Sequence, residues 1–231
     1  MIFDGYDFRP LVAVEQVHRP LLPSVSVSSS DGTGRDGAEF KQATLDPMDI
    51  EVDVRLIAPG KGRFEQLRRA LAPRLLKRSP AKLVLPDAPD VYYMAVLSGD
   101  TDIDRFVHTG GVTLTFHCDD PVAYGAEKSR EVDGGGEATF VVGGTYKTAP
   151  VISVGITGSA STVEVDGKPM RALGNVTSAH PLVLDCESHA TTKGGATVKL
   201  NVMDDYATWE PGTHTVSCES PYTVRWRERW L

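Results

Sequence analysis

The stretch from Gly111 to Tyr124 reads Gly-Val-Thr-Leu-Thr-Phe-His-Cys-Asp-Asp-Pro-Val-Ala-Tyr. Its apolar residues alternate with threonine and histidine, which is typical of a strand with one buried face. Pro121 can donate no ladder hydrogen bond and favours extended geometry at Asp120, so the strand is predicted to end there. The pattern of the chain also changes at this point, and we therefore predict two domains, over residues 1–124 and 125–231.

The first domain is predicted to be mainly β with one helix. Alternation of apolar and polar residues predicts strands, of which the segment from Asp49 to Ile57 is the clearest. From Gly62 onward, Phe64, Leu67, Leu71 and Leu75 recur at helical spacing, and Pro73 is expected to end or kink that helix. The predicted strands cover residues 11–17, 24–30, 49–57, 82–85, 91–98, 101–108 and 111–118.

The loop from Asp31 to Gly37 is rich in glycine and aspartate. It has neither the alternating acids and distal glutamate of a calcium loop nor the Gly-Lys-Ser/Thr of a phosphate-binding loop. Asp-Gly pairs supply the positive φ angles of tight turns, so we predict a hairpin tip.

The second domain is punctuated by glycine pairs and short strands, which indicates an antiparallel β-sandwich. Val165-Asp166-Gly167-Lys168 has the composition of a hairpin turn. The predicted strands cover residues 139–142, 151–156, 161–165, 182–186, 197–202 and 222–231.

Composition is that of an ordinary globular protein, with 41% hydrophobic and 24% charged residues. No apolar run approaches the ~20 residues that span a bilayer, and no signal sequence begins the chain, so we expect no export and no membrane partner. The net charge of -7 argues against general nucleic-acid affinity. The three cysteines form no Cys-x-x-Cys pair and are expected to be reduced and buried.

Basic residues are concentrated in one segment. Between Lys61 and Lys82 there are eight basic residues against Glu65 alone, a local charge of +7 in a chain whose remainder is near -14. This segment is either a solvated helix face or a docking surface for an acidic partner. The candidate docking patch comprises Arg63, Arg68, Arg69, Arg74, Lys77 and Arg78.

No catalytic or metal-binding motif is present in the sequence, and no cofactor is expected. The six histidines have no ligand spacing. Asp119-Asp120 and Asp204-Asp205 are adjacent, so in an extended chain their side chains diverge, and turn capping explains them better than acid–base chemistry. Arg225, Arg227 and Arg229 could bind an anion, but a solvent-facing strand explains them equally well.

The stretch from Gly111 to Tyr124 resembles the end of the N-terminal domain of phage distal tail proteins. The matching positions are Thr113, Leu114, Phe116, Cys118, Asp120, Pro121 and Tyr124, with the aromatic residue later than is usual in the family. The resemblance implies a split-barrel-like sheet with one helix, followed by a jelly-roll or galectin-like β-sandwich. It also implies a structural virion protein of a phage or prophage, assembled in the host bacterial cytoplasm and without catalysis.

The same resemblance implies the partners. A homo-hexameric ring of N-terminal domains would join the tail tube protein to the tail tip, baseplate or tail-associated hub protein, with the C-terminal domains projecting outward. No sequence-specific nucleic acid is expected.

Two other classes of function remain open. Exposed Trp209, Trp226 or Trp230 could stack on sugar rings of a host surface saccharide, which would make the chain a carbohydrate-binding module for receptor recognition. The alternation of these residues favours a place in the core instead. The third class is an enzyme whose site assembles from residues that share no linear motif.

Overall fold

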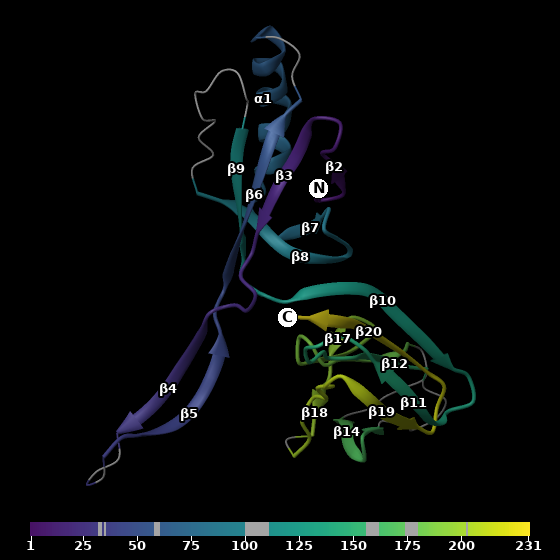
Figure 1. The fold of residues 1–231 in the computed structure, drawn as a ribbon. Helices are drawn as coiled ribbons and strands as arrows, with labels where there is room; N and C mark the ends of the chain where they lie inside the picture. The colour runs from purple at the N-terminus through teal and green to yellow at the C-terminus, as the bar shows by residue number, and fades with distance from the viewer. Residues whose placement is uncertain are drawn as a thin grey trace. The chain divides into compact units, whose positions relative to one another are not determined.

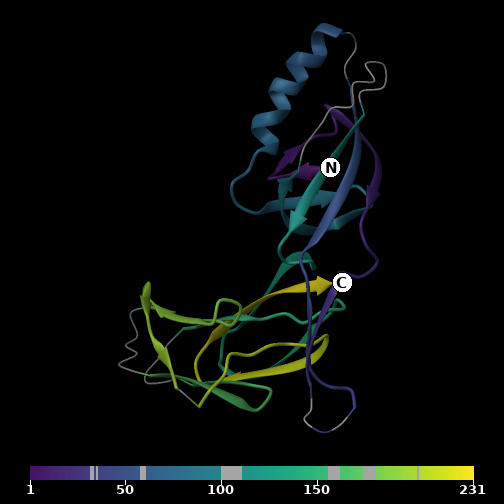
Figure 2. The same ribbon diagram turned by 90° about the vertical axis from the view of Figure 1, so that its left-hand side faces the viewer.

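We describe the protein from a computed structural model (Figures 1 and 2). The structure describes residues 1–31, 34, 36–57, 61–99, 111–155, 162–173, 180–201 and 203–231, without the side chains of residues 61–65. It divides into two compact units, Met1–Ala123 with Leu231, and Tyr124–Trp230. The described residues form antiparallel strands and a single α-helix, so the predicted mainly β class is confirmed.

Seven of the described strands form the part of a larger sheet that belongs to the first unit. β6 (Met48–Leu56) lies between β3 (Val12–His18) and β9 (Gly111–Cys118), and both pairings are antiparallel. Beyond β9 the order continues through β8 (Ala88–Ser98), β7 (Ala81–Leu85), β1 (Ile2–Phe3) and β2 (Tyr6–Asp7). The strand predicted over residues 101–108 lies outside the described residues.

The alternation that predicted β6 and β9 produces one apolar and one polar face. The apolar residues of both strands are buried, and Phe116 meets Phe3 edge to face with ring centroids 5.1 Å apart. The buried residues on these strands are Met48, Ile50, Val52, Val54, Val112, Leu114, Phe116 and Cys118.

The helix α1 (Lys61–Leu75) covers this apolar face, and Figure 2 shows it alongside the sheet. Leu71 and Leu75 are buried and line an apolar pocket with Val54 and Leu114. Leu67 is half-buried. Pro73 does not end the helix at once, because it lies in the last turn and the helix continues to Leu75.

Two strands of the first unit form a separate hairpin, which we call the arm. β4 (Val25–Asp31) and β5 (Ala38–Leu45) pair with each other and, among the described residues, with no other strand. Asp31 pairs with Ala38, which confirms the predicted hairpin tip. β5 is not predicted by strict alternation because a bulge opposite Ser28 and Ser29 shifts the phase of its apolar residues.

The second unit contains two sheets. In the first the strand order is β17-β16-β15-β12-β20-β10, and in the second it is β11-β19-β13-β14-β18. The first sheet comprises β10 (Ala123–Val132), β12 (Val151–Val154), β15 (Leu182–Asp185), β16 (Ala190–Lys193), β17 (Ala196–Thr197) and β20 (Tyr222–Trp230). The second sheet comprises β11 (Gly136–Val142), β13 (Thr162–Val165), β14 (Lys168–Leu173), β18 (Lys199–Leu200) and β19 (Gly212–Cys218).

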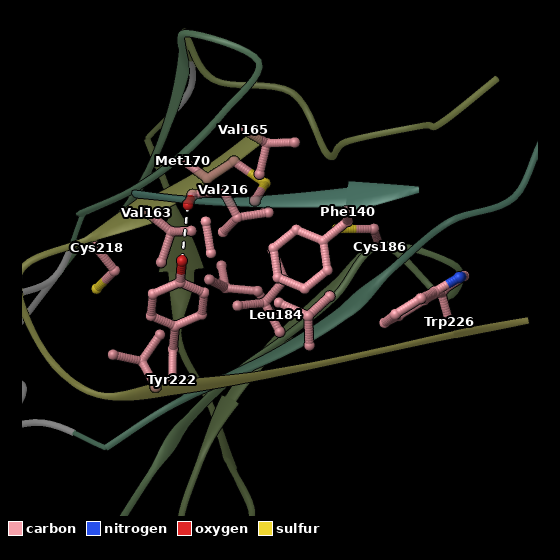
Figure 3. Packing of buried hydrophobic residues seen from close by; sticks show 14 of the residues in the cluster. Phe140, Val163, Val165, Met170, Leu184, Cys186, Val216, Cys218, Tyr222 and Trp226 are labelled. Atoms are coloured by element: carbon pink, nitrogen blue, oxygen red, sulfur yellow. Dashed lines mark hydrogen bonds between the residues drawn. The ribbon is translucent and has the colours of Figure 1, made fainter. Parts of the chain in front are cut away.

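Side chains from both sheets fill one core (Figure 3). Phe140 of β11 stacks on Trp209 and meets Trp226 of β20 edge to face, with centroids 5.8 and 5.7 Å away. The hydroxyl of Tyr222 donates a 2.7 Å hydrogen bond to the carbonyl oxygen of Val216, which joins β20 to β19 across the core.

The hairpin turn predicted at residues 165–168 is confirmed, since Val165 pairs with Lys168 and both central residues have positive φ. The single strand predicted over residues 197–202 is wrong. That segment holds β17 in one sheet and β18 in the other, because the chain crosses between sheets, and residue 202 lies outside the description. Alternation also fails to mark β10, β14, β16 and β19.

Candidate interaction surfaces

The predicted docking patch is spread over α1 and the residues after it, because α1 ends at Leu75 and both Lys77 and Arg78 follow that end. Arg68 lines the apolar pocket beside Leu71 and Leu75, on the side of the sheet. Arg69 lies about 160° around the helix from Leu71, so it points away from the sheet. Arg69 and Arg78 are both exposed and, in the described part of the chain, have no ion-pair partner. The side chain of Arg63 lies outside the described residues.

Other members of the patch are engaged within the unit. The guanidinium of Arg74 lies 4.2 Å from the centre of the Tyr6 ring and donates to the carbonyl of Ala70. Lys77 forms an ion pair with Asp4 at 2.5 Å. These contacts fix the end of the helix against β2 and its turn, so Arg74 and Lys77 stabilise the unit itself.

A second charged surface lies on the sheet of the first unit, on the side that α1 does not cover. The polar residues of β3, β6 and β9 share one face, which we call the polar sheet face. Glu51 is exposed and has no ion-pair partner among the described residues, whereas Glu15 pairs with Arg55 at 3.0 Å. The sequence showed the polar side of β6, but only the strand register brings histidines onto the same face.

Two histidines on the polar sheet face contact carboxylates. His117 lies opposite Asp49, with Nδ1 2.7 Å from the carboxylate, and its Nε2 is 3.4 Å from Asp119. The hydrogen bond to Asp49 raises the pKa of His117, against a smaller opposing effect of burial. Asp53 accepts hydrogen bonds from Thr113 and His18, at 2.6 and 3.0 Å, and these lower the pKa of its carboxyl group.

The arm carries an uncovered apolar surface. Val25 lies opposite Leu45 and Val27 opposite Ala43, so these four side chains share a face. The bulge places Phe40 opposite Ser29 on that same face. Val27 is 63% exposed and Phe40 is 64% exposed, whereas the opposite face carries serine, threonine, glutamine and lysine.

The family-matching positions lie around the end of β9. Phe116 and Cys118 are buried in the sheet, and Asp120 accepts a hydrogen bond from the backbone nitrogen of Val122 at 3.3 Å, as expected for a turn cap. Pro121 is also buried, and Tyr124 lies under the guanidinium of Arg229 with 4.8 Å to the ring centre. These positions close the first unit and begin the second.

The tryptophans considered for sugar binding lie mostly in the core. Trp209 is 0% exposed and Trp226 is 9% exposed, so neither offers a ring face for stacking. Trp230 is half-buried against Gly125. The structure therefore places Trp209 and Trp226 in the core, as the strand alternation favoured, and Trp230 outside it.

Two of the three arginines on β20 contact other side chains of the second unit. Arg227 forms an ion pair with Glu127 at 2.6 Å, and Arg229 lies over the rings of Tyr124 and Tyr146. Arg225 is exposed.

One of the adjacent acidic pairs differs from its prediction. Asp204 was predicted to cap a turn, but its carboxylate accepts hydrogen bonds from the backbone nitrogen and the guanidinium of Arg171, at 2.8 and 2.9 Å. The bond with the Arg171 side chain lowers the pKa of Asp204. The side chain therefore links the segment after β18 to β14, a contact that spacing in the sequence could not reveal.

Groups suited to chemistry are scarce in the described residues. No group of three or more His, Cys, Asp or Glu side chains there is arranged to hold a metal ion. Burial raises the pKa of Cys118 to about 12 and that of Cys186 to about 11, so these buried thiols are not thiolates near neutral pH. Among the described helices, none is long and apolar enough to cross a membrane.

Comparisons with known proteins agree with this architecture. Residues 11–118 match the family model of the phage tail protein RIFT-related domain, and residues 143–230 match that of the siphovirus-type tail component, C-terminal domain. The chain is 26% identical over 244 residues to the distal tail protein of Bacillus phage SPP1, covering 100% of this chain and 95% of the relative.

Solved structures share the fold. The crystal structure of the SPP1 Dit protein, described as a paradigm of the hub adsorption apparatus in phages that infect Gram-positive bacteria, matches with a TM-score of 0.74. It is 19% identical, and the match covers 100% of this chain and 98% of that one. A chain of the phage P2 baseplate in its activated conformation with calcium matches with a TM-score of 0.53 at 10% identity, over 94% of this chain and 90% of that one.

Proposed function

Since the chain belongs to the siphovirus distal tail protein family, we propose that it is a structural hub protein of a phage tail. In this proposal a homo-hexameric ring joins the tail tube to the tail tip or baseplate. Residues 1–124 form the ring and residues 125–231 project outward. The protein acts by assembly and catalyses no reaction, and it belongs to the virion.

The apolar face of the arm is the observation that carries this proposal. A two-stranded hairpin is at best marginally stable by itself in water, and this one leaves Val27 and Phe40 more than half exposed. Leu21, just before β4, is fully exposed as well. Burial of these side chains against another protein would remove apolar area from water at about 25 cal/mol per Å².

A second copy of the chain is the partner that fits the proposed ring. An arm on one copy that contacts a different surface of the next copy makes a head-to-tail interface, and such interfaces close into rings when the rotation between copies permits. The basic patch of α1 and the residues after it, with Arg63, Arg68, Arg69, Arg74, Lys77 and Arg78, is proposed as a further docking surface for an acidic partner. Tail tube and tail tip proteins would then bind the two sides of the ring.

The test is the mass of the purified protein by light scattering, with negative-stain imaging of the same sample. We expect a ring of about 150 kDa, which is six copies of the 25.0 kDa chain. Monomers at every concentration, both alone and with the tail tube protein, would contradict the ring.

Substitutions in the arm test whether its apolar face contributes to ring assembly. Val27→Ser with Phe40→Ser should shift the mass towards the monomer, because it removes the apolar face. The matched control is Ser28→Ala with Gln42→Ala, an opposed pair on the polar side of the arm, which should leave the mass unchanged. Equal effects of the two double variants would mean that the apolar face does not make the contact.

A further inference from the structure

Arg69 on the outer face of α1 and Arg78 just after the helix present positive charge that no described residue of the first unit pairs with. Lys77 is paired with Asp4 and Arg74 lies on Tyr6, but Arg69 and Arg78 are exposed without an ion pair among the described residues. Leu71 and Leu75 attach the helix to the sheet by its opposite side. The basic face is therefore held in place and directed away from the body of the unit.

The polar sheet face presents the opposite charge. Four carboxylates on β3 and β6 lie there with one guanidinium, that of Arg55, so the face carries about three negative charges when its histidines are neutral. Glu51 lies near the middle of β6 and has no ion-pair partner among the described residues. The four carboxylates belong to Glu15, Asp49, Glu51 and Asp53.

The two charged surfaces lie on opposite sides of one layer. Val52 and Val54 point from β6 towards the buried side that α1 covers, while Glu51 and Asp53 alternate with them and point the other way. Because the sheet separates them, the basic and acidic surfaces of one copy cannot neutralise each other. Surfaces of opposite charge on opposite sides of one unit are suited to head-to-tail contacts between copies.

We propose that the basic surface made by Arg69 on the outer face of α1 and by Arg78 after the end of the helix docks on the polar sheet face of a second copy of this chain, directed to the carboxylates around Glu51. This inference rests on the ring proposed above and names the surfaces that meet in it. The occupant is a second copy because the complementary surface is present in the chain itself, in the same unit. Charge complementarity of this kind sets the register and rate of assembly, and the apolar arm supplies area removed from water.

Charge reversal tests the pairing in the full-length protein. Arg69→Glu with Arg78→Glu, and separately Glu51→Lys, should each weaken self-association about tenfold or more at low salt. The triple variant carries both reversals and replaces one of the facing carboxylates by a cation, so repulsion between its copies falls and association should recover in part. Exposed charges are screened by salt, so the differences between variants should shrink as ionic strength rises.

A matched control removes the effect of net charge. Lys168→Glu with Lys199→Glu makes the same charge change at exposed positions of the second unit and should leave association unchanged. Circular dichroism and thermal melting of every variant confirm that each folds as the wild type does.

The outcomes separate this inference from the ring itself. If the wild type forms rings and the Arg69/Arg78 reversal behaves as the control does, the pairing is wrong and the ring stands. If that reversal disrupts rings and the further addition of Glu51→Lys recovers no association, the basic surface meets something other than the polar sheet face, which also overturns the inference. A wild type that never associates overturns the ring, and the inference with it.

Discussion

His117 of β9 and Asp49 of β6 are directly opposed in the sheet, and Nδ1 of the histidine lies 2.7 Å from the carboxylate. The two strands are thus joined by a side-chain ion pair in addition to their backbone ladder. The contact lies at the end of β9, close to the turn that closes the first unit. Its strength depends on pH, because only the protonated histidine carries the positive charge.

The His117 contact should make stability depend on pH. The pKa of His117 is raised above its ordinary 6.5 by the hydrogen bond to Asp49, so the folded state holds the proton more tightly. The stabilisation is therefore complete below pH 6.5 and is lost as the pH rises through the raised pKa. The melting temperatures of wild type and His117→Asn should differ most near pH 5.5 and converge above about pH 8.

The size of this effect should be that of an exposed ion pair, about 0.2–1 kcal/mol, and salt should reduce it. His180→Asn is the control, since His180 is exposed and has no carboxylate partner among the described residues. A difference for His117→Asn that grows towards alkaline pH would contradict the assignment.

Gly144 should not tolerate a side chain. It has φ of +88°, and a Cβ atom there would overlap the backbone carbonyl oxygen of Arg229, whose strand it bridges. Gly144→Ala should lower the free energy of unfolding by about 3 kcal/mol or more, from backbone strain together with the overlap. Gly167→Ala tests the strain alone, because Gly167 has φ of +73° with open space around it, and should cost about 1–2 kcal/mol. Denaturant unfolding would measure the loss of stability in both variants. An equal loss in Gly144→Ala and Gly167→Ala would show that the structure relieves the overlap at Gly144.

The hydroxyl of Tyr222 should contribute to the stability of the second unit. It donates to the carbonyl of Val216 at 2.7 Å inside the core, and Tyr222→Phe removes that bond without changing the ring. We expect a loss of about 1 kcal/mol in unfolding free energy. Tyr146→Phe is the comparison, because the Tyr146 ring contacts Arg229 through its face and keeps that contact as phenylalanine. If Tyr222→Phe leaves the free energy of unfolding unchanged, the carbonyl group of Val216 has found another hydrogen-bond donor.

The burial of each leucine in α1 should decide how much its replacement by alanine lowers the free energy of unfolding. Leu71 is 6% exposed and Leu67 is only half-buried, so Leu71→Ala should cost about 2–5 kcal/mol and Leu67→Ala clearly less. Thermal unfolding of the two variants would rank them. A larger effect at Leu67 would mean that the helix turns a different side to the sheet.

Local patterns predicted the elements in which burial follows a regular period. β6 and β9 alternate without interruption, and α1 repeats leucine at helical spacing, so each could be located before any partner was known. β5 was missed because its bulge moves the apolar positions out of phase. β10 was missed because its burial is confined to its first residues, and the rest of the strand is exposed.

The interaction surfaces were only partly visible in the sequence. The basic segment could be counted, but the contacts of Arg74 with Tyr6 and of Lys77 with Asp4 join residues about 70 positions apart, which meet only after folding. The arm was predicted as a hairpin, but its single apolar face depends on the register of β4 against β5.

By itself the sequence determined the mainly β class, the single helix, the strand that closes the first unit and the resemblance to distal tail proteins. These follow from residue order alone, because alternation, helical spacing and proline act over a few neighbouring residues. The tertiary structure alone decided that Arg69 and Arg78 have no ion-pair partner among the described residues, and that His18 and His117 share a face with Asp49 and Asp53. Those relations join residues distant along the chain, and strand register and side-chain packing establish them only when the whole unit folds.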